Sequence, residues 1–200
     1  MTEEGVFKLY DEFRTPVHVR AHCLQVARIG RLLAEKLSEK GENVDPELVW
    51  VAGLVHDFIR IVDFKDIPAD LGTPEDHLVW NRIRQTYSGH HADIGAEILE
   101  EMNEPVLAEI IRKHKHTAIT TDPPTTWEEK IICYADKRVT HGDIVGMKDR
   151  LDEGFARHFP GEEVPQEEIE RRKKIDALEE ELFNKIDLSP EDVGIVLGED

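Results

Sequence analysis

Cysteine is scarce in this sequence: Cys23 and Cys133 are its only two, and they form no spaced motif. Both lie within helical patterns, so we expect buried thiols in a reducing environment. No apolar run approaches the roughly 20 residues that span a bilayer. The acidic start of the chain also lacks the shape of a signal peptide. We therefore expect a cytoplasmic protein that does not contact a membrane.

Basic residues are also few: the sequence has 25 Lys and Arg residues and 43 Asp and Glu residues, which gives a net charge of -18. A field of this sign repels a phosphate backbone, so duplex nucleic acid is not an expected partner. A small phosphorylated ligand can still bind where a metal or a local basic cluster reverses the sign. The length of 200 residues and the apolar fraction of 40% are typical of one globular domain with a buried core.

Strand-like alternation is absent, and helical periodicity runs through most of the chain. Thr15-Pro16 and Asp45-Pro46 each predict a cap followed by proline in the first helical turn, and Gly41 is expected to end the first of these helices. The full set of predicted helices is 15–41, 45–62, one short helix around 75–83 in an otherwise irregular connection, 90–103, 104–116, 127–146 and one from about 165 onward. The predicted fold class is all-α. We assign residues 1–160 to one domain and residues 161–200 to a charged C-terminal helix with an acidic tail packed on it.

Several polar residues lie on apolar faces of these helices. The candidates are His22, His56, Asp57, His91, His114 and Asp136. A single histidine on an apolar face is more often a hydrogen-bonded core residue. Six buried His and Asp groups would each need partners, however, whereas one metal or a metal pair satisfies them all. Imidazole and carboxylate donors suit iron, manganese, zinc or related divalent ions, and the two oxygens of Asp57 can bridge two ions.

The order His22, then His56-Asp57, then Asp136 resembles the signature of the HD superfamily of metal-dependent phosphohydrolases. The segments "TPVHVRAHCLQVA", "LVHDFIR", "HADIGAEIL" and "WEEKIICYADKRV" resemble HDIG-type members, over roughly residues 15 to 150. This resemblance implies an HD-domain helical bundle. The additional His91 and His114 resemble the subset that binds two metals, which includes HD-type diadenosine tetraphosphate hydrolases and HD-GYP cyclic dinucleotide phosphodiesterases.

The chain also departs from these relatives. The Gly-Tyr-Pro motif is missing, which argues against cyclic di-GMP phosphodiesterase activity. Phe58, Ile59 and Arg60 stand where stringent-response hydrolases place a Glu-Asp pair. Two-metal relatives usually carry lysine three residues after the aspartate, at the position of Arg60. Arginine keeps the positive charge and can hold a phosphate through two hydrogen bonds.

The resemblance implies a role for each site residue. The six ligands would bind two divalent ions, with iron or manganese expected first and zinc, cobalt, nickel or magnesium as alternatives. Asp57 and Arg60 are the predicted catalytic residues, and Arg60 with Lys137 is predicted to hold substrate phosphate. Within "RKHKH" we assign the metal ligand to His114, with His116 as the alternative.

The predicted function is hydrolysis of a phosphomonoester or phosphoanhydride of a small phosphorylated metabolite, with a nucleotide as the expected substrate, by a metal-activated hydroxide. One alternative is a one-metal site in which His91 and His114 bind substrate. A second is a nucleotide-binding regulatory module with little turnover, and a third is a di-iron oxygenase on the same scaffold. The charged C-terminal helix is a candidate contact for a homodimer.

Overall fold

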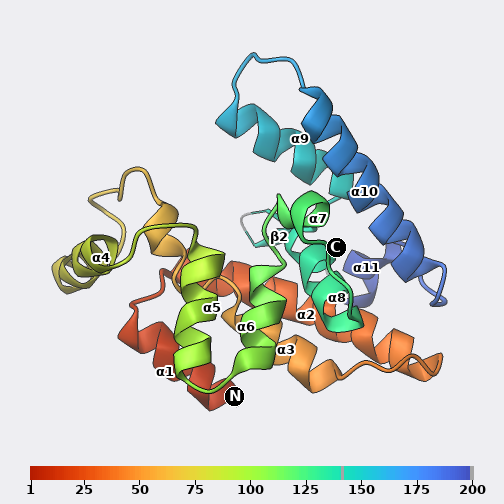
Figure 1. Cartoon of the computed structure of the whole chain (residues 1–200), viewed down its shortest axis with the longest axis horizontal. Helices are drawn as coiled ribbons and strands as arrows, with labels where there is room; N and C mark the ends of the chain where they lie inside the picture. The colour runs from red at the N-terminus through yellow and green to blue at the C-terminus, as the bar shows by residue number, and fades with distance from the viewer. Residues whose placement is uncertain (141, 199–200) are drawn as a thin grey trace.

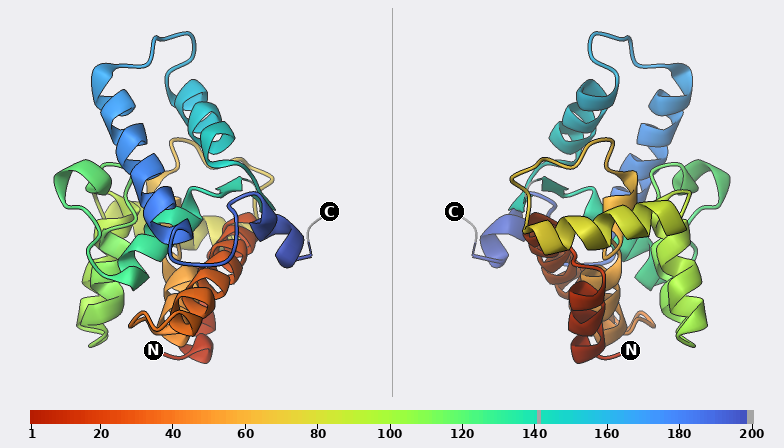
Figure 2. Two further views of the ribbon diagram at one scale, coloured as in Figure 1. Left: turned by 90° about the vertical axis from the view of Figure 1, so that its right-hand side faces the viewer. Right: turned by 90° about the vertical axis from the view of Figure 1, so that its left-hand side faces the viewer.

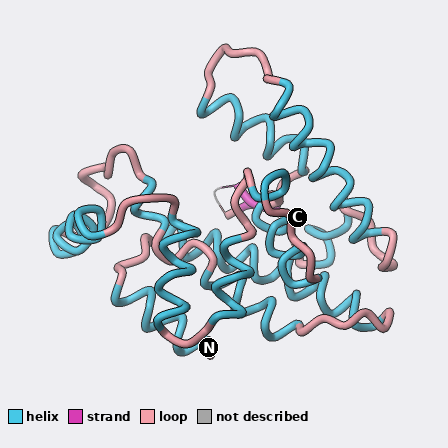
Figure 3. The backbone as a smooth tube through the Cα atoms, in the orientation of Figure 1, coloured by secondary structure: helices cyan, strands magenta, loops and turns pink. Residues whose placement is uncertain are grey.

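The computed structural model describes residues 1–140 and 142–198; His141 and the last two residues of the predicted acidic tail lie outside this range. Helices make up almost all of its regular structure (Figure 3). In chain order they are α1 (Glu3–Glu12), α2 (Val17–Glu39), α3 (Pro46–Val55), the 3-10 helix η1 (Arg60–Asp63), α4 (Pro74–Thr86), α5 (His91–Glu101), α6 (Pro105–Arg112), α7 (Ala118–Thr121), α8 (Trp127–Asp136), α9 (Met147–His158), α10 (Gln166–Phe183) and α11 (Asp192–Val196). The all-α prediction is confirmed.

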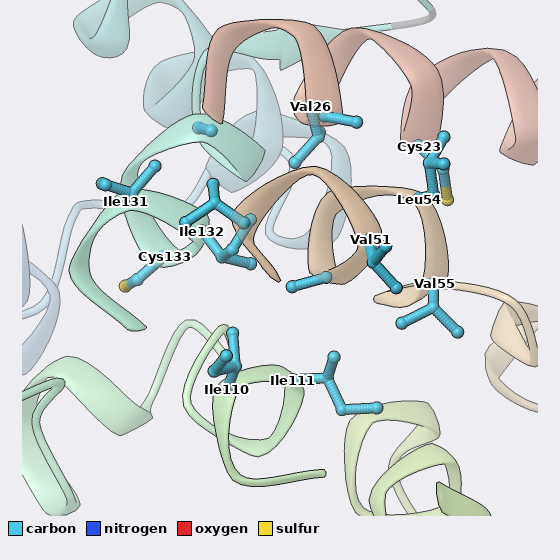
Figure 4. Close-up of a cluster of buried hydrophobic side chains, with 14 of the residues drawn as sticks. Cys23, Val26, Val51, Leu54, Val55, Ile110, Ile111, Ile131, Ile132 and Cys133 are labelled. Carbon is cyan, nitrogen blue, oxygen red and sulfur yellow. The ribbon is translucent and has the colours of Figure 1, made fainter. Parts of the chain in front are cut away.

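The core lies where α2, α3, α6 and α8 meet (Figures 1 and 4). α2 runs along α3, α8 contacts both, and α5 packs beside α6. Val26 of α2, Val55 of α3 and Ile132 of α8 are fully buried in this cluster, together with Ile111 of α6. Each such side chain contributes about 1.5–3 kcal/mol when it leaves water. These four helices therefore form a rigid frame, and the candidate ligands lie on it or at its ends.

The closest approach of α2 and α3 occurs at Gly53. A Cβ atom at this position would lie 2.5 Å from the Cα atom of Ala27 in α2, far inside normal contact distance. Only glycine allows the two helices this spacing. Because His56 and Asp57 directly follow α3, this contact also fixes how far they lie from α2.

The first two predicted helices differ in how they begin. Asp45 caps α3 as predicted, since its carboxylate accepts from the backbone N–H groups of Glu47 and Leu48. The predicted capping role of Thr15 is wrong, because Pro16 is the N-cap of α2 and no side chain caps it. The Thr15 hydroxyl instead donates to the backbone carbonyl of Phe58 at 2.7 Å. Thr15 thus ties the start of α2 to the turn that follows His56 and Asp57.

The helices predicted over 45–62 and 127–146 end well before those limits. α3 ends at Val55, and the chain turns before η1 begins at Arg60. α8 ends at Asp136, and β1 (Val139–Thr140) pairs with β2 (Asp143–Ile144) in an antiparallel hairpin. The sequence did not predict these strands because two residues are too few to show alternation. In both places the helix stops at a candidate metal ligand.

α9 and α10 form a helical hairpin that projects from the body (Figures 1 and 2). Arg172 of α10 ties the two together by donating to Asp152 and to the backbone carbonyl of Leu151 in α9. The other end of α10 packs on α8 and α7 through buried Ile175 and Leu178. The division into domains 1–160 and 161–200 stays a prediction.

Two further sequence expectations concern the thiols and the membrane. Cys23 and Cys133 are buried free thiols, as predicted. None of the helices in the described ranges has both the length and the hydropathy of a membrane span.

Candidate metal centre

The structure brings all six candidate ligands together from five separate elements. His22 comes from the second turn of α2, and His56 and Asp57 directly follow α3. His91 is the first residue of α5, His114 lies just after α6, and Asp136 is the last residue of α8. Most of these ligands lie at or next to the end of a helix. A side chain in that position is not confined to the helix face that packs in the core.

One half of the cluster contains His22, His56 and Asp136. The Nε2 atom of His22 lies 3.1 Å from Oδ1 of Asp136 and 3.3 Å from Nε2 of His56. Nε2 of His56 lies 3.7 Å from the same Asp136 oxygen. The three side chains thus present two ring nitrogens and one carboxylate oxygen to a common point.

The other half contains His91 and His114. Their Nε2 atoms are 3.0 Å apart, and they lie 2.8 Å and 3.4 Å from Oδ1 of Asp57. Both rings are buried, with 1% and 3% of each residue exposed. A second convergence of two ring nitrogens and one carboxylate oxygen therefore lies beside the first.

Asp57 lies between the two halves. Its Oδ1 atom faces His91 and His114, whereas its Oδ2 atom lies 3.9 Å from Nε2 of His22 and 3.8 Å from Nε2 of His56. One carboxylate thus gives one oxygen to each pair of histidines. This is the arrangement that a bridging carboxylate requires.

The second ring nitrogen of three histidines is held by the protein. Nδ1 of His56 donates to the backbone carbonyl of Gly53 at 2.8 Å, and Nδ1 of His114 donates to that of Ile111. Nδ1 of His91 donates to Oδ2 of Asp63 at 2.5 Å. This network assigns the hydrogen to Nδ1, so Nε2 faces the cluster. Metal-binding histidines are held in the same way.

The donor atoms fit a divalent cation. At 3.0 Å, the Nε2 atoms of His91 and His114 can carry at most one hydrogen between them. Oδ1 of Asp57 is buried and accepts no hydrogen bond of good geometry, although Nε2 of His91 is 2.8 Å away. Adjacent ligands of one ion, each about 2.1 Å from it, are themselves roughly 3.0–3.4 Å apart. The spacing of both histidine pairs lies in this range.

The charges around the cluster keep its aspartates ionised. Burial by itself would raise the pKa of Asp57, but Arg60, His91 and His56 hold it well below its usual range. Burial of Asp136 is likewise outweighed by hydrogen bonds from His22 and His56, and its pKa is also well below normal. Both groups are therefore carboxylates at neutral pH, the form that binds metal.

The carboxylate of Asp57 also acts on two neighbouring histidines. Burial lowers the pKa of both His56 and His91, but the nearby carboxylate of Asp57 outweighs burial and raises both pKa values. Protons on these rings thus supply the positive charge that the carboxylates attract. A bound metal would displace them, so metal affinity should rise with pH.

His114 behaves in the opposite way, and this can be measured. Burial lowers its pKa to about 4, so we expect a neutral ring in the metal-free protein at neutral pH. The unfolded chain takes up this proton near pH 6.5. The contribution of His114 to the free energy of unfolding therefore falls as the pH drops from about 6.5 to about 4. An NMR titration of the metal-free protein should show the ring changing near pH 4; a midpoint at the ordinary histidine value would contradict this assignment.

Asp63 is a site residue that the sequence did not predict. Its carboxylate accepts both from Nδ1 of His91 at 2.5 Å and from the His91 backbone N–H at 3.2 Å. It thus fixes the position and the tautomer of that ring. Asp63 comes from η1 and no sequence spacing links it to His91, so only the folded chain reveals the pair.

Asp63→Asn is expected to weaken metal binding about 10–100-fold, the usual effect of losing an orienting carboxylate. The amide keeps the size of the side chain but no longer favours the His91 tautomer that leaves Nε2 free. Calorimetric titration of the metal-free protein with Mn²⁺ measures the effect. Asp66→Asn is the control, because it removes an exposed carboxylate from the same loop. Equal affinities in the two variants would exclude this role for Asp63.

The other predicted site residues lie close to the cluster. Nη1 of Arg60 is 3.0 Å from Nε2 of His91 and 3.6 Å from Oδ1 of Asp57, so its guanidinium borders the second half. Lys137 is buried, and its ammonium donates to the backbone carbonyls of His114 and Cys133. These bonds support the turn that carries His114, whereas a role in holding phosphate stays a prediction.

The structure also separates the two histidines of "RKHKH". His114 lies in the cluster, whereas Nε2 of His116 lies 2.9 Å from Oε2 of Glu168 in α10. The assignment of the metal ligand to His114 rather than to His116 stays a prediction.

A cavity of about 840 Å³ opens beside the cluster. His22, Asp57, His91, His114 and Asp136 line one part of it, and residues of α9 and α10 line another. The cluster is therefore open to a ligand of considerable size.

Comparison with known proteins gives one family and one relative. The family model described as HD domain matches residues 19–140, more than half of the chain. An uncharacterized protein of Methanocaldococcus jannaschii is 31% identical over 147 residues, which cover 64% of this chain and 73% of the relative. No solved structure matches. The family match supports metal-dependent phosphohydrolase activity in general.

Proposed function

The chain belongs to the HD domain family, and from this premise we propose that it binds two divalent metal ions and hydrolyses the phosphate ester or anhydride of a nucleotide. The ligands would be His22, His56 and Asp136 for one ion, His91 and His114 for the other, and Asp57 for both. Iron and manganese are the proposed metals because they accept mixed imidazole and carboxylate ligands.

The observation that supports two ions best is the division of the Asp57 oxygens between two pairs of histidines. In a one-metal site His91 and His114 would bind substrate, and their ring nitrogens would be free to lie apart. They lie 3.0 Å from each other and both face the same oxygen of Asp57. Two ring nitrogens that converge on one carboxylate oxygen favour a shared cation, a proton or a metal ion, over two separate substrate contacts.

The chemistry follows from the charges of the site. Divalent ions bound here would supply an activated water and neutralise charge that develops on the phosphoryl group. Arg60 stands where its guanidinium can hold a phosphate oxygen beside His91. Asp57 and His91 are buried, which strengthens their interactions because water screens them less, whereas Arg60 is partly exposed in the cavity.

Metal analysis and a substrate panel test the proposal together. Protein loaded with Mn²⁺ or Fe²⁺ is expected to contain two ions per chain and to release phosphate or a nucleotide from at least one member of a panel of nucleoside mono-, di- and triphosphates. One ion per chain at saturation would rule out the two-metal site. Two ions with no hydrolysis of any member would favour the regulatory module, and substrate-dependent oxygen consumption would favour the oxygenase.

A further inference from the structure

We propose that β1 and the α9–α10 hairpin form the substrate-selecting wall of this site, where Thr140 of β1 and Arg171 of α10 bind the nucleoside part of a nucleotide whose phosphate lies at the metal centre. This inference rests on the proposed function, since it assumes that phosphate binds at the cluster. Phe155, Phe159 and Arg171 lie beyond the span that the family model matches, whereas Thr140 is the last residue of that span.

The cavity is large enough for a whole nucleotide. Its volume of about 840 Å³ lies in the range of sites for whole small molecules, about 300–1,000 Å³, so a phosphate group alone would leave most of it empty. It extends from Asp57 and His91 to Phe155 of α9 and Arg171 of α10. Residues of the projecting hairpin, whose backbone is seen in Figures 1 and 2, therefore line the same cavity as the ligands.

The cavity has more basic than acidic lining residues. Its basic lining residues are Arg60, Lys115, Lys137, Arg150, Arg157 and Arg171. Apart from the metal ligands Asp57 and Asp136, its acidic lining residues are Glu153, Glu167 and Glu168. The balance is thus positive in a chain of net charge -18. This local reversal favours an anionic ligand.

Some residues that line the cavity have buried polar atoms without a hydrogen-bond partner. Within residues 1–140 and 142–198, four buried side-chain N or O atoms lack a hydrogen-bond partner, and three of them belong to cavity-lining residues: Oδ1 of Asp57, Oγ1 of Thr140 and Nε of Arg171. A buried polar atom without a partner is costly, and a bound water, ion or ligand can supply the missing hydrogen bond. Oγ1 of Thr140 and Nε of Arg171 are enclosed by protein, so the proposal requires each side chain to rotate toward the cavity that its residue lines. Base and ribose offer the ring nitrogens, carbonyls and hydroxyls that they require.

Aromatic side chains on the hairpin complete the match to a nucleoside. The rings of Phe155 and Phe159 lie 5.2 Å apart at an angle of 30°, and both residues line the cavity. Aromatic faces bind a nucleobase by stacking, which adds affinity without requiring one base. The hairpin therefore offers a stacking surface, whereas Thr140 and Arg171 offer hydrogen bonds.

Paired phosphonates test the proposal, because their phosphorus–carbon bonds resist hydrolysis. Methylphosphonate reaches only the metal centre, whereas 5′-methylenephosphonate analogues of adenosine, guanosine, cytidine and uridine also reach the hairpin. Binding is measured by calorimetry on the full Mn²⁺-loaded chain. We expect at least one nucleoside analogue to bind tenfold or more tightly than methylphosphonate.

Two variants then locate the contact. Thr140→Val removes a hydroxyl that has no hydrogen-bond partner in residues 1–140 and 142–198. Arg171→Lys keeps the charge beside Glu168 but removes Nε. Each is expected to weaken the nucleoside analogue five- to tenfold and to change methylphosphonate by less than twofold. Arg112→Lys is the control, since Arg112 pairs with two glutamates and lies outside the cavity lining. Thermal unfolding of each variant verifies that it is folded.

The outcomes separate this inference from the proposed function. Nucleoside analogues that bind no more tightly than methylphosphonate overturn the inference, as do variants that weaken both ligands equally. If the nucleoside analogues and the variants bind as expected but no nucleotide is hydrolysed, the proposed function is wrong. The role of the substrate-selecting wall in binding a nucleoside is then still supported.

Discussion

Asp57→Asn should reduce phosphate release by roughly 10³-fold or more, the scale expected when a metal-assisted reaction loses its shared ligand. The reason is that one carboxylate faces both pairs of histidines, so its loss affects both halves of the cluster at once. The amide has nearly the same shape but only one oxygen and no charge. Bound metal should fall from two ions per chain to one or none, as measured by elemental analysis after dialysis.

The same substitution should leave the metal-free fold intact. It removes a buried charge that the metal-free protein accommodates only with help from Arg60 and nearby histidines. The matched control is Asp122→Asn, which removes an exposed carboxylate paired with Lys113. Full metal content and full activity in Asp57→Asn would refute the bridging role, provided that circular dichroism shows both variants folded.

Gly53→Ala should lower the free energy of unfolding by about 3 kcal/mol, the upper part of the usual range for overpacking. The new methyl group would lie 2.5 Å from Cα and 2.8 Å from N of Ala27, and a backbone cannot move aside as a flexible side chain can. Helix α3 must therefore shift away from α2. His56 and Asp57 follow α3 directly, so metal affinity should fall along with stability.

Denaturant titration of the metal-free protein separates the two effects. Gly194→Ala in α11 is the control, because a Cβ there meets nothing within 4 Å and Gly194 has no left-handed backbone. That change should be neutral or stabilise by up to about 1 kcal/mol. A loss below about 1 kcal/mol for Gly53→Ala, on the scale of ordinary substitutions, would mean that the two helices tolerate a wider spacing.

The sequence predicted the parts of this protein that depend on local periodicity. His22 lies one turn before Val26, and the face they share is the one that packs in the core. Asp45-Pro46 begins α3 as expected, since capping and proline act within one helical turn. The all-α class follows from the same signals repeated along the chain.

The sequence failed where a side chain acts over a long separation. Thr15 has the residue type of a cap, yet its hydroxyl bonds to Phe58, 43 residues away. Asp63 orients His91 across 28 residues, and no pattern in the chain connects them. Arg171 reaches the cavity only because α10 folds back on α9. Tertiary contacts decide all three roles, and periodicity carries no information about them.

The spread of the ligands along the chain has a consequence for folding. His22 and Asp136 are separated by 114 residues, and the remaining ligands come from the segments between them. An ion held at this point would act as a cross-link that closes several large loops at once, as a set of disulfides would. Such a link costs the unfolded chain much of its freedom, and the loss grows with loop length. The two thiols are buried and free, so the metal would be the cross-link of this fold, and the free energy of unfolding would rise with the metal concentration.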